Sequence, residues 1–224
     1  MMQTRQPSPA VGQFLCGALV AMTLIGTAVQ PPAGGAARAA PAHSVGAARP
    51  VVRTRGGVAT DVSGAITADT VWGPGGSPYV VTGDMTVNNG FTLTVAPGVE
   101  VRFDGNYALN VRGTLEAEGT AAQPILFTSN QPEPAPGDWA FLDLRGDSVN
   151  SVLRHTVVEY GGKATRAGSG CAAGTLCVHR DSFELDQSTV RESATRGLVL
   201  VQSDAKITGN TFHANAEEAI RLHT

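Results

Sequence analysis

The chain has 224 residues, of which 42% are apolar, 5% aromatic and 16% charged, with a formal net charge of −3 at pH 7. Few aromatic residues combined with 27 glycines favour thin, repetitive β architecture over a helical fold with a deep core. The chain has no excess of basic residues to follow a phosphate backbone, so nucleic acid is not an expected partner.

The first 40 residues are typical of a secretory signal peptide. Arg5 lies in a short polar leader, an uncharged apolar stretch runs from Val11 to Val29, and Ala37-Arg38-Ala39 resembles an A-x-A cleavage site. A membrane anchor is the alternative, but a span needs about 20 apolar residues, and this shorter stretch is interrupted by glycines. A lipoprotein anchor at Cys16 is a weaker alternative, because Gln13 stands where such motifs have an aliphatic residue. We therefore expect a secreted or cell-surface protein without a membrane span after cleavage.

Residues 41–60 are rich in Ala, Gly, Pro and Arg without apolar periodicity, which predicts a flexible linker. From residue 61 to 224, short apolar alternations recur between Gly, Pro and Asn turns, as β-strands do. No part of this region sustains a long helical period. Examples of the expected strands are Tyr79–Val81, Leu93–Val95, Val101–Phe103, Leu109–Val111 and Ile125–Phe127.

Internal repetition decides between a β-sandwich and a solenoid, since a sandwich has no reason to keep one register along the chain. A shift of about 22 residues superposes apolar residues in both halves, which predicts an all-β, right-handed parallel β-helix solenoid with about six coils. The superposed pairs are Leu185 with Ile207, Val190 with Phe212, Ser193 with Asn215, Leu198 with Ile220, Leu200 with Leu222, Leu176 with Leu198, Val178 with Leu200, Val87 with Leu109, Leu93 with Leu115, and Phe103 with Ile125.

The central segment fits this repeat if one insertion is allowed. Leu153 matches Leu185 at an offset of 32, which is one period plus ten, and the surplus falls in the Gly-rich segment 163–174. In the same alignment Thr156, Ser188 and Asn210 form a polar column that can hydrogen-bond along the solenoid axis.

The insertion contains Cys171 and leads to Cys177. Signal cleavage removes Cys16, so these two cysteines remain in an oxidising compartment, and five residues between them allow a small disulfide loop. The alternative is a pair of free thiols or half a metal site. No other cysteine completes such a site, and His179 alone does not. We predict the Cys171–Cys177 disulfide.

The same register places opposite charges on each other along the outer face, as neighbouring strands prefer. Each exposed pair is worth less than about 1 kcal/mol, so the pairs serve mainly as independent support for the register. They are Glu184 with Lys206, Arg196 with Glu218, Arg154 with Asp186, and Glu159 with Arg191.

Several segments resemble secreted bacterial right-handed parallel β-helix repeat proteins of the pectin lyase-like superfamily. The resemblance covers nearly all of the chain after residue 61 and implies the fold, whereas members of the superfamily range from polysaccharide lyases and hydrolases to non-catalytic surface proteins. It rests on Ser77–Asp84, Leu93–Phe103, Leu109–Thr120, Pro124–Thr128 and Asn210–Phe212.

Pectate-lyase-like enzymes place several calcium-binding Asp residues beside a basic residue on one sheet. Asp138, Asp143 and Asp147 near Arg145 are the closest approach to this arrangement, but no neighbouring coil carries a matching acidic ladder. We therefore expect a solvated outer face there rather than a metal site.

Glycosidases of this fold need two carboxylates with different pKa values. Glu159, Asp181, Glu184 and Asp186 are candidates, but the register assigns three of these four to ion-pair ladders. The four histidines of this region show no metal-ligand spacing. The two tryptophans are candidates for stacking on sugar rings, but Trp72 lies in a Gly-Pro-rich segment near the amino-terminal end of the solenoid, where burial is at least as strongly expected. These residues are His155, His179, His213, His223, Trp72 and Trp139.

No catalytic, cofactor-binding or metal-binding residue is therefore predicted. The apolar repeat continues at full strength to Ile220 and Leu222, so we expect an uncapped carboxyl end that belongs to a longer protein or is covered by another chain. The sequence predicts a surface or carbohydrate-binding and structural module, with extracellular polysaccharide as its partner. The alternative is a polysaccharide lyase or glycoside hydrolase that needs further coils.

Overall fold

Most of the described chain lies in short β-strands. The computed structural model describes residues 58–145, 150–163, 174–180 and 182–223. Apart from strands, these residues form one turn of 3₁₀ helix, η1 (Pro74–Gly76). None of them belongs to a helix that is long and apolar enough to cross a membrane. The predicted signal peptide and most of the predicted linker lie outside the described residues, so both stay predictions.

The strands form a 12-stranded and a 6-stranded parallel sheet. The larger sheet consists of two rows of strands joined at one long strand, and we call these rows sheet 1 and sheet 2; the smaller sheet is sheet 3. Every complete coil contributes one strand to each of the three. Sheet 1 contains β6 (Leu109–Val111), β9 (Leu142–Leu144), β12 (Gly174–His179), β15 (Arg196–Val201) and β18 (Ile220–His223). Sheet 2 contains β5 (Glu100–Phe103), β8 (Ile125–Ser129), β11 (Thr156–Glu159), β14 (Thr189–Arg191) and β17 (Thr211–His213). Sheet 3 contains β2 (Thr70–Trp72), β4 (Thr92–Val95), β7 (Thr114–Glu118), β10 (Val152–Arg154), β13 (Glu184–Asp186) and β16 (Lys206–Thr208).

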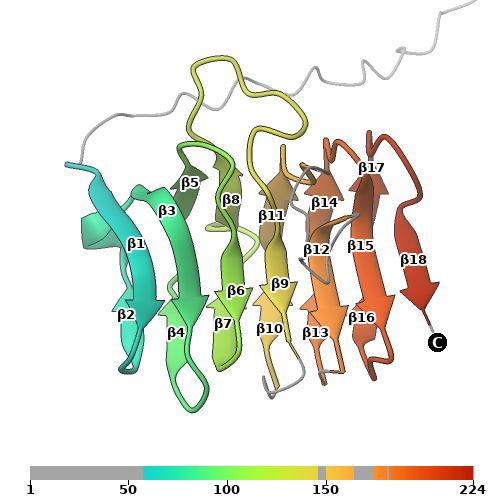
Figure 1. The fold of residues 1–224 in the computed structure, drawn as a ribbon, viewed down its shortest axis with the longest axis horizontal. Helices are drawn as coiled ribbons and strands as arrows, with labels where there is room; N and C mark the ends of the chain where they lie inside the picture. Colours follow the sequence, from blue (N-terminus) through green and yellow to red (C-terminus); the bar gives the residue numbers. More distant parts are fainter. Residues whose placement is uncertain (1–57, 146–149, 164–173, 181, 224) are drawn as a thin grey trace, which may run out of the picture. The chain divides into compact units, whose positions relative to one another are not determined.

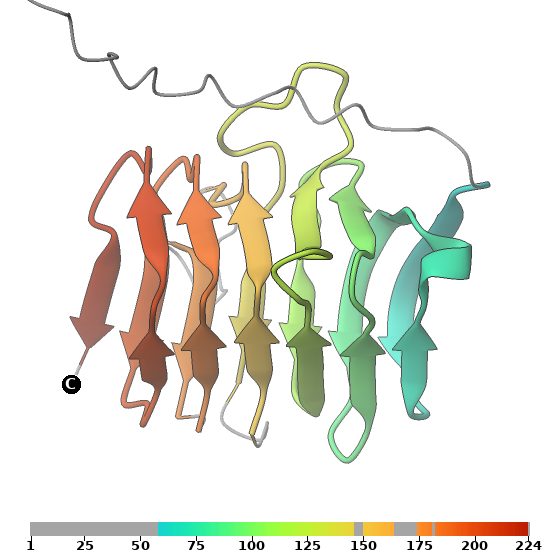
Figure 2. The ribbon, with the colours of Figure 1, turned by 180° about the vertical axis from the view of Figure 1, so that it is seen from behind.

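Two further strands begin the stack. The long strand β3 (Tyr79–Val87) pairs with β5 through its first residues and with β6 through its last, so it joins sheets 1 and 2. Strand β1 (Thr60–Ile66) pairs with β3. Figure 1 shows the successive coils from β1 to β18, and Figure 2 shows them from behind. The six strands of sheet 3 confirm the predicted parallel β-helix with about six coils.

The predicted register is confirmed in the last coils. Leu185 pairs with Leu153 on one side and Ile207 on the other, and Val190 pairs with Phe212. The pairs that join β12 to β15 and β15 to β18 are confirmed as well.

In the first half, the predicted pair of Leu93 and Leu115 is confirmed, but two other pairs are wrong. Val87 pairs with Val111 at an offset of 24, and Phe103 pairs with Ser129 at an offset of 26. Both offsets differ from 22 by an even number. Because strand side chains alternate with a period of two, such a slip keeps inward residues inward, and the apolar pattern alone does not detect it.

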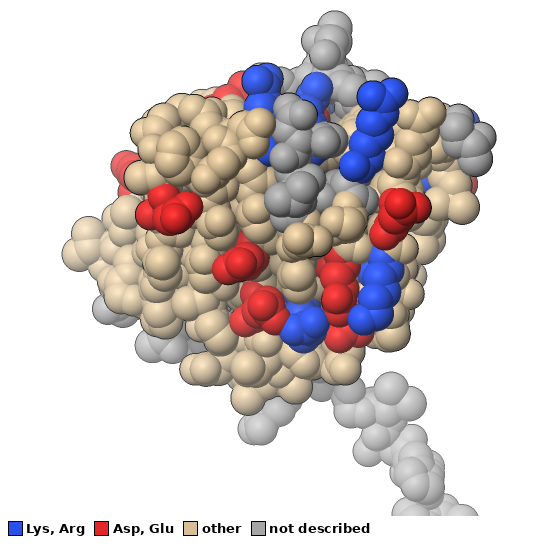
Figure 3. Space-filling view, turned by 90° about the horizontal axis from the view of Figure 1, so that it is seen from below, with Lys and Arg blue, Asp and Glu red and all other residues tan. Residues whose placement is uncertain are grey.

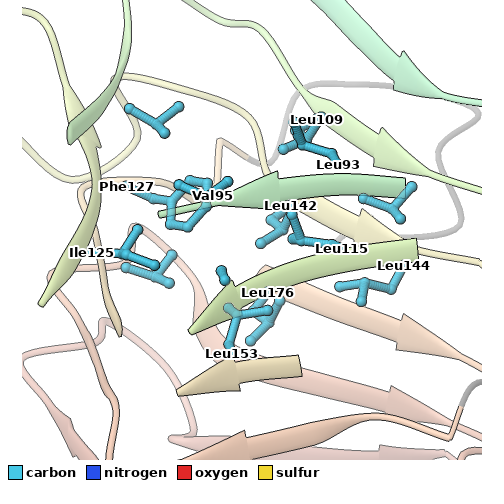
Figure 4. Close-up of a cluster of buried hydrophobic side chains, with 14 of the residues drawn as sticks. Leu93, Val95, Leu109, Leu115, Ile125, Phe127, Leu142, Leu144, Leu153 and Leu176 are labelled. Atoms are coloured by element: carbon cyan, nitrogen blue, oxygen red, sulfur yellow. The ribbon is translucent and has the colours of Figure 1, made fainter. Parts of the chain in front are cut away.

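The core is a set of stacked apolar columns between the three sheets. In sheet 1, Leu109, Leu142, Leu176 and Leu198 lie directly on one another, and all four are fully buried. Figure 4 shows leucines of several successive strands packed together in this interior. At the last coil, Ile220 and Leu222 stay 38% and 69% exposed. The expectation that this end belongs to a longer protein or is covered by another chain stays a prediction.

Two insertions lengthen the central coils. The predicted one lies between β11 and β12, and its residues 164–173 are outside the described part of the chain. The second, which the repeat does not predict, is a loop over residues 130–141 between β8 and β9 (Figure 1). It makes the offset from Leu109 to Leu142 equal to 33. Trp139 fixes the end of this loop. It is fully buried, stacks on Phe103 with ring centroids 4.0 Å apart, and donates a hydrogen bond to the Glu159 carbonyl at 2.8 Å.

The predicted polar column runs along the turns between sheets 3 and 2. The backbone N–H of Thr156 donates to Ser188 Oγ at 3.0 Å, and that of Ser188 donates to Asn210 Oδ1 at 2.8 Å. Asn210 Nδ2 in turn donates to the Leu185 carbonyl at 2.7 Å. Each side chain therefore bonds to the backbone of the preceding coil, which holds the turns in register because buried polar groups need partners.

All four predicted ion pairs on the outer faces are present. Glu159 and Arg191 lie opposite each other in sheet 2, with a 2.6 Å contact. The other contacts are 3.3 Å between Lys206 and Glu184, 3.4 Å between Arg154 and Asp186, and 2.5 Å between Arg196 and Glu218.

We predict that Ser188→Ala lowers the free energy of unfolding by about 1–3 kcal/mol, because the substitution leaves the buried N–H of Thr156 without its acceptor. Urea unfolding measures the change. The control is Thr211→Ala at an exposed position of β17, for which we expect little change. Equal unfolding midpoints for both variants and the unsubstituted chain would contradict a stabilising role of the polar column.

Candidate functional site

A fully buried carboxylate lies on the outer side of sheet 1. Asp143 stands between Leu142 and Leu144 in β9, both of which point into the core, so its side chain points outward. It is nevertheless 0% exposed, and the prediction of a solvated outer face at this position is therefore wrong. Its neighbours in register are Asn110 on β6 and Cys177 on β12.

The outer side of this sheet is partly apolar, which explains the burial. Phe141, Cys177 and Val199 are buried together in a second apolar cluster, separate from the core between the sheets. Solvent is therefore excluded on the side of Asp143 that faces β12 and β15. A carboxylate in such a position needs charged or hydrogen-bonding partners from its own surroundings.

Arg145 and His179 supply these partners. Arg145 follows Asp143 by two residues and so lies on the same face, and its Nε and Nη2 atoms both lie 2.8 Å from Asp143 Oδ2. His179 lies on β12, where the pairing of Leu144 with Val178 brings it next to Arg145. Its Nε2 atom is 3.4 Å from Asp143 Oδ1. One carboxylate oxygen thus meets a guanidinium and the other meets an imidazole.

The contact between Asp143 and His179 is incomplete. Asp143 Oδ1 and His179 Nε2 are both buried, and neither makes a well-formed hydrogen bond with the described residues. Most buried polar atoms in folded proteins have such a partner, so each exception calls for an explanation. Hydrogen bonds of catalytic groups are often long in the absence of a ligand.

Burial shifts the two titrating groups in opposite directions. Burial raises the pKa of Asp143 above its ordinary value, and the charges of Arg145 and His179 oppose this rise. Burial lowers the pKa of His179, Asp143 opposes this change, and Arg145, Arg180 and His223 lower the pKa further. His179 is therefore neutral at pH 7. Clustered groups with shifted pKa values are typical of functional sites.

Further basic side chains lie next to the cluster formed by Asp143, Arg145 and His179. Arg112, Arg145 and His179 follow one another on successive coils, because the residues before them are paired. Arg180 is exposed beside His179, and Arg221 and His223 lie on β18. Within the five strands of sheet 1, all of which the structure describes, Asp143 is the only carboxylate.

Sheet 3 has the opposite charge balance. Arg154 contacts the carboxylates of Glu118, Glu184 and Asp186, and Glu184 also meets Lys206. The view in Figure 3 shows basic side chains gathered along its upper part and most of the acidic ones below them. The faces of the solenoid therefore differ in charge, although the chain as a whole is only mildly acidic.

The other candidate carboxylates are used in structural contacts. Glu159 is buried, accepts a hydrogen bond from Thr128 Oγ1 at 2.8 Å and pairs with Arg191. Asp138 belongs to the 130–141 loop, where it binds Ser129 Oγ at 2.6 Å and the Ala135 backbone N–H at 2.9 Å. The structure thus does not bring Asp138 into the cluster of Asp143. The remaining two candidates, Asp147 and Asp181, lie outside the described residues.

The remaining predicted residues are placed as follows. Trp72 is 4% exposed and stacks on Tyr79, which confirms its expected burial. Trp139 is fully buried as well, so neither ring offers an open sugar-stacking surface. Cys177 is buried on β12, while Cys171 lies outside the described residues, and the disulfide stays a prediction. Among the described residues, no group of three or more His, Cys, Asp or Glu side chains could hold a metal ion.

Sequence comparison gives one family match. Residues 64–173 match the family model described as a pectate-lyase like beta helix domain. This range contains Asp143 and Arg145 but ends before His179. No curated protein and no solved structure matches the chain significantly.

We predict that His179→Gln changes how stability depends on pH. Because the folded-state pKa of His179 lies below its ordinary value of 6.5, the unfolded state binds the proton more readily, and stability contributed by the neutral imidazole is lost as pH falls below about 6.5. Urea unfolding between pH 5 and pH 8 should give a smaller loss on acidification for the variant than for the unsubstituted chain. The control is His213→Gln at an exposed position. A larger loss in His179→Gln would mean that the protonated imidazole stabilises the fold.

Proposed function

Because residues 64–173 match a pectate-lyase like beta helix domain and the described strands form a parallel β-helix, we propose that the chain is a secreted or cell-surface module that binds an acidic polysaccharide on the outer side of sheet 1. The observation that carries this proposal is the pair of cations Arg112 and Arg145 on successive coils, with Arg180 next to the neutral His179 on the following coil. The predicted signal peptide supports the extracellular location.

This arrangement suits a polymer better than a small anion. Neighbouring coils are about 4.8 Å apart, so the side chains of Arg112, Arg145 and His179 form a regular line along the solenoid axis. An acidic polysaccharide also repeats its charge along a line. Each exposed charge contact is weak, but several contacts on one polymer reinforce one another.

We predict that the double substitution Arg112→Gln and Arg180→Gln weakens binding to immobilised polygalacturonate. Both residues are exposed and make no described ion pair, so the fold should tolerate the change. A loss of about 1 kcal/mol per cation corresponds to roughly fivefold weaker binding for each substitution, and the salt dependence should also decrease. Surface plasmon resonance at two salt concentrations measures both effects.

Lys206→Gln on sheet 3 is the control, since it removes one exposed positive charge from another face. Neutral galactan serves as the control ligand. Equal binding to both polymers, or an equal loss with Lys206→Gln, would refute the proposed surface.

A polysaccharide lyase or glycoside hydrolase is the second candidate function. The observation that favours it is the contact of a buried carboxylate with an imidazole whose pKa is shifted. Incubation with polygalacturonate, followed by assays for unsaturated products and for new reducing ends, separates this candidate from simple binding. Product release that His179→Gln abolishes would establish the enzyme.

A further inference from the structure

We infer that Asp143 fixes His179 in the tautomer that carries its proton on Nε2, which leaves Nδ1 as a proton acceptor for a ligand on sheet 1. The structure thereby assigns an acid–base site to this face. The inference rests on the proposed function for the identity of the ligand, but the state of the imidazole is independent of it.

The tautomer follows from the contacts of the carboxylate. Asp143 Oδ2 is occupied by two nitrogen atoms of Arg145, and a guanidinium ion pair of this kind favours the ionised carboxylate. The other oxygen, Oδ1, faces Nε2 of His179 at 3.4 Å. An ionised carboxylate attracts an N–H group and repels a nitrogen lone pair, so this contact favours the proton on Nε2, and a neutral imidazole with that proton has an unprotonated Nδ1.

The ring is placed so that its other edge can meet a ligand. Nε2 is buried, yet the His179 side chain keeps 20% of its surface exposed, so the exposed part of the ring excludes Nε2. Arg145 beside it is 36% exposed while it holds the carboxylate. A negatively charged group near Arg145 would therefore lie next to the exposed edge of the imidazole.

The charges around the ring favour a neutral base. Burial lowers the pKa of His179 most, Asp143 opposes this change, and Arg145, Arg180 and His223 lower the pKa further. An imidazole that is unprotonated at neutral pH can accept a proton from a bound ligand. A buried carboxylate that orients an imidazole and stabilises its protonated form serves the same purpose in the catalytic triads of hydrolases.

The proton-transfer step balances without a further reactant. A bond forms between Nδ1 and the proton of a ligand hydroxyl group or acidic C–H group, and the ligand bond to that proton breaks. The electron pair stays on the ligand oxygen or carbon. Asp143 then faces an imidazolium, and the proton leaves Nδ1 to the ligand or to water.

The tautomer can be measured directly in the unsubstituted full chain. Two-dimensional ¹H–¹⁵N spectra that correlate ring nitrogens with ring carbon-bound protons distinguish the two neutral tautomers, and the His179→Gln spectrum identifies the His179 signals. We expect the Nε2–H form at pH 7. Detection of the Nδ1–H form, or of an imidazolium, would overturn the inference. Because the spectra are recorded on the unsubstituted chain, the test does not depend on whether an Asp143 variant folds.

A second measurement tests whether Asp143 sets the state of the imidazole and whether His179 is accessible to a ligand. Diethyl pyrocarbonate acylates an unprotonated, accessible imidazole nitrogen, and we expect Asp143→Asn to slow acylation of His179 several-fold and to give a mixture of tautomers. The control variant is Lys206→Gln, which should change neither result. An unchanged tautomer and rate in a folded Asp143→Asn variant would show that Asp143 does not set the state of the ring.

Added polygalacturonate separates this inference from the proposed function. Binding that changes the His179 titration supports both, whereas binding that leaves the titration unchanged refutes proton transfer with that ligand. If no polysaccharide binds, the proposed function fails, while the tautomer and the acylation rate still decide whether the acid–base site exists.

Discussion

The hydrogen bonding of each coil to the next is the constraint on which the rest of the molecule depends. Parallel pairing fixes every strand residue directly beside its counterpart in the neighbouring coil. A column of side chains must therefore be compatible along its length. Inward columns are apolar, the turn column of Thr156, Ser188 and Asn210 bonds to backbone, and outer columns alternate in charge where they can.

Asp143 shows what happens when a column does not supply the opposite charge. Glu159 in sheet 2 meets Arg191 in its own column, so the pair is complete. Asp143 instead lies between Asn110 and Cys177, and it must find Arg145 and His179 in the adjacent column. That diagonal arrangement leaves one carboxylate oxygen and one ring nitrogen without a complete hydrogen bond. The same stacking rule that stabilises sheet 2 thus leaves an incompletely hydrogen-bonded pair in sheet 1.

The sequence predicts the fold and much of the later register because the last coils repeat every 22 residues without interruption. It does not predict the first register shifts, since slips of two and four residues preserve the inward pattern at Val87 and Phe103. The cluster around Asp143 was missed for a related reason. Arg145 and His179 are separated by an insertion, and their proximity depends on the offset of 34 between Leu144 and Val178. The matching pattern of Leu142–Leu144 and Leu176–Val178, apolar at both ends, is the signal that could have placed His179 beside Arg145.

The sheets differ in how their charges are paired, and this difference distinguishes the faces that stabilise the fold from the face that is a candidate for function. In sheet 3 each described cation meets carboxylates, as Arg154 and Lys206 do, and in sheet 2 Arg191 meets Glu159. These contacts neutralise the outer faces and contribute to holding the coils in register. Within its described strands sheet 1 contains one carboxylate, Asp143, which is buried. Arg196 and Arg221 of this sheet meet Glu217 and Glu218, which lie just before β18, whereas Arg112 and Arg180 make no described ion pair. Stacking alone gives no reason for a face with an excess of positive charge, because like charges on adjacent strands repel each other. An anionic ligand would remove this repulsion, and for that reason the outer side of sheet 1 is where the function of this solenoid should be sought.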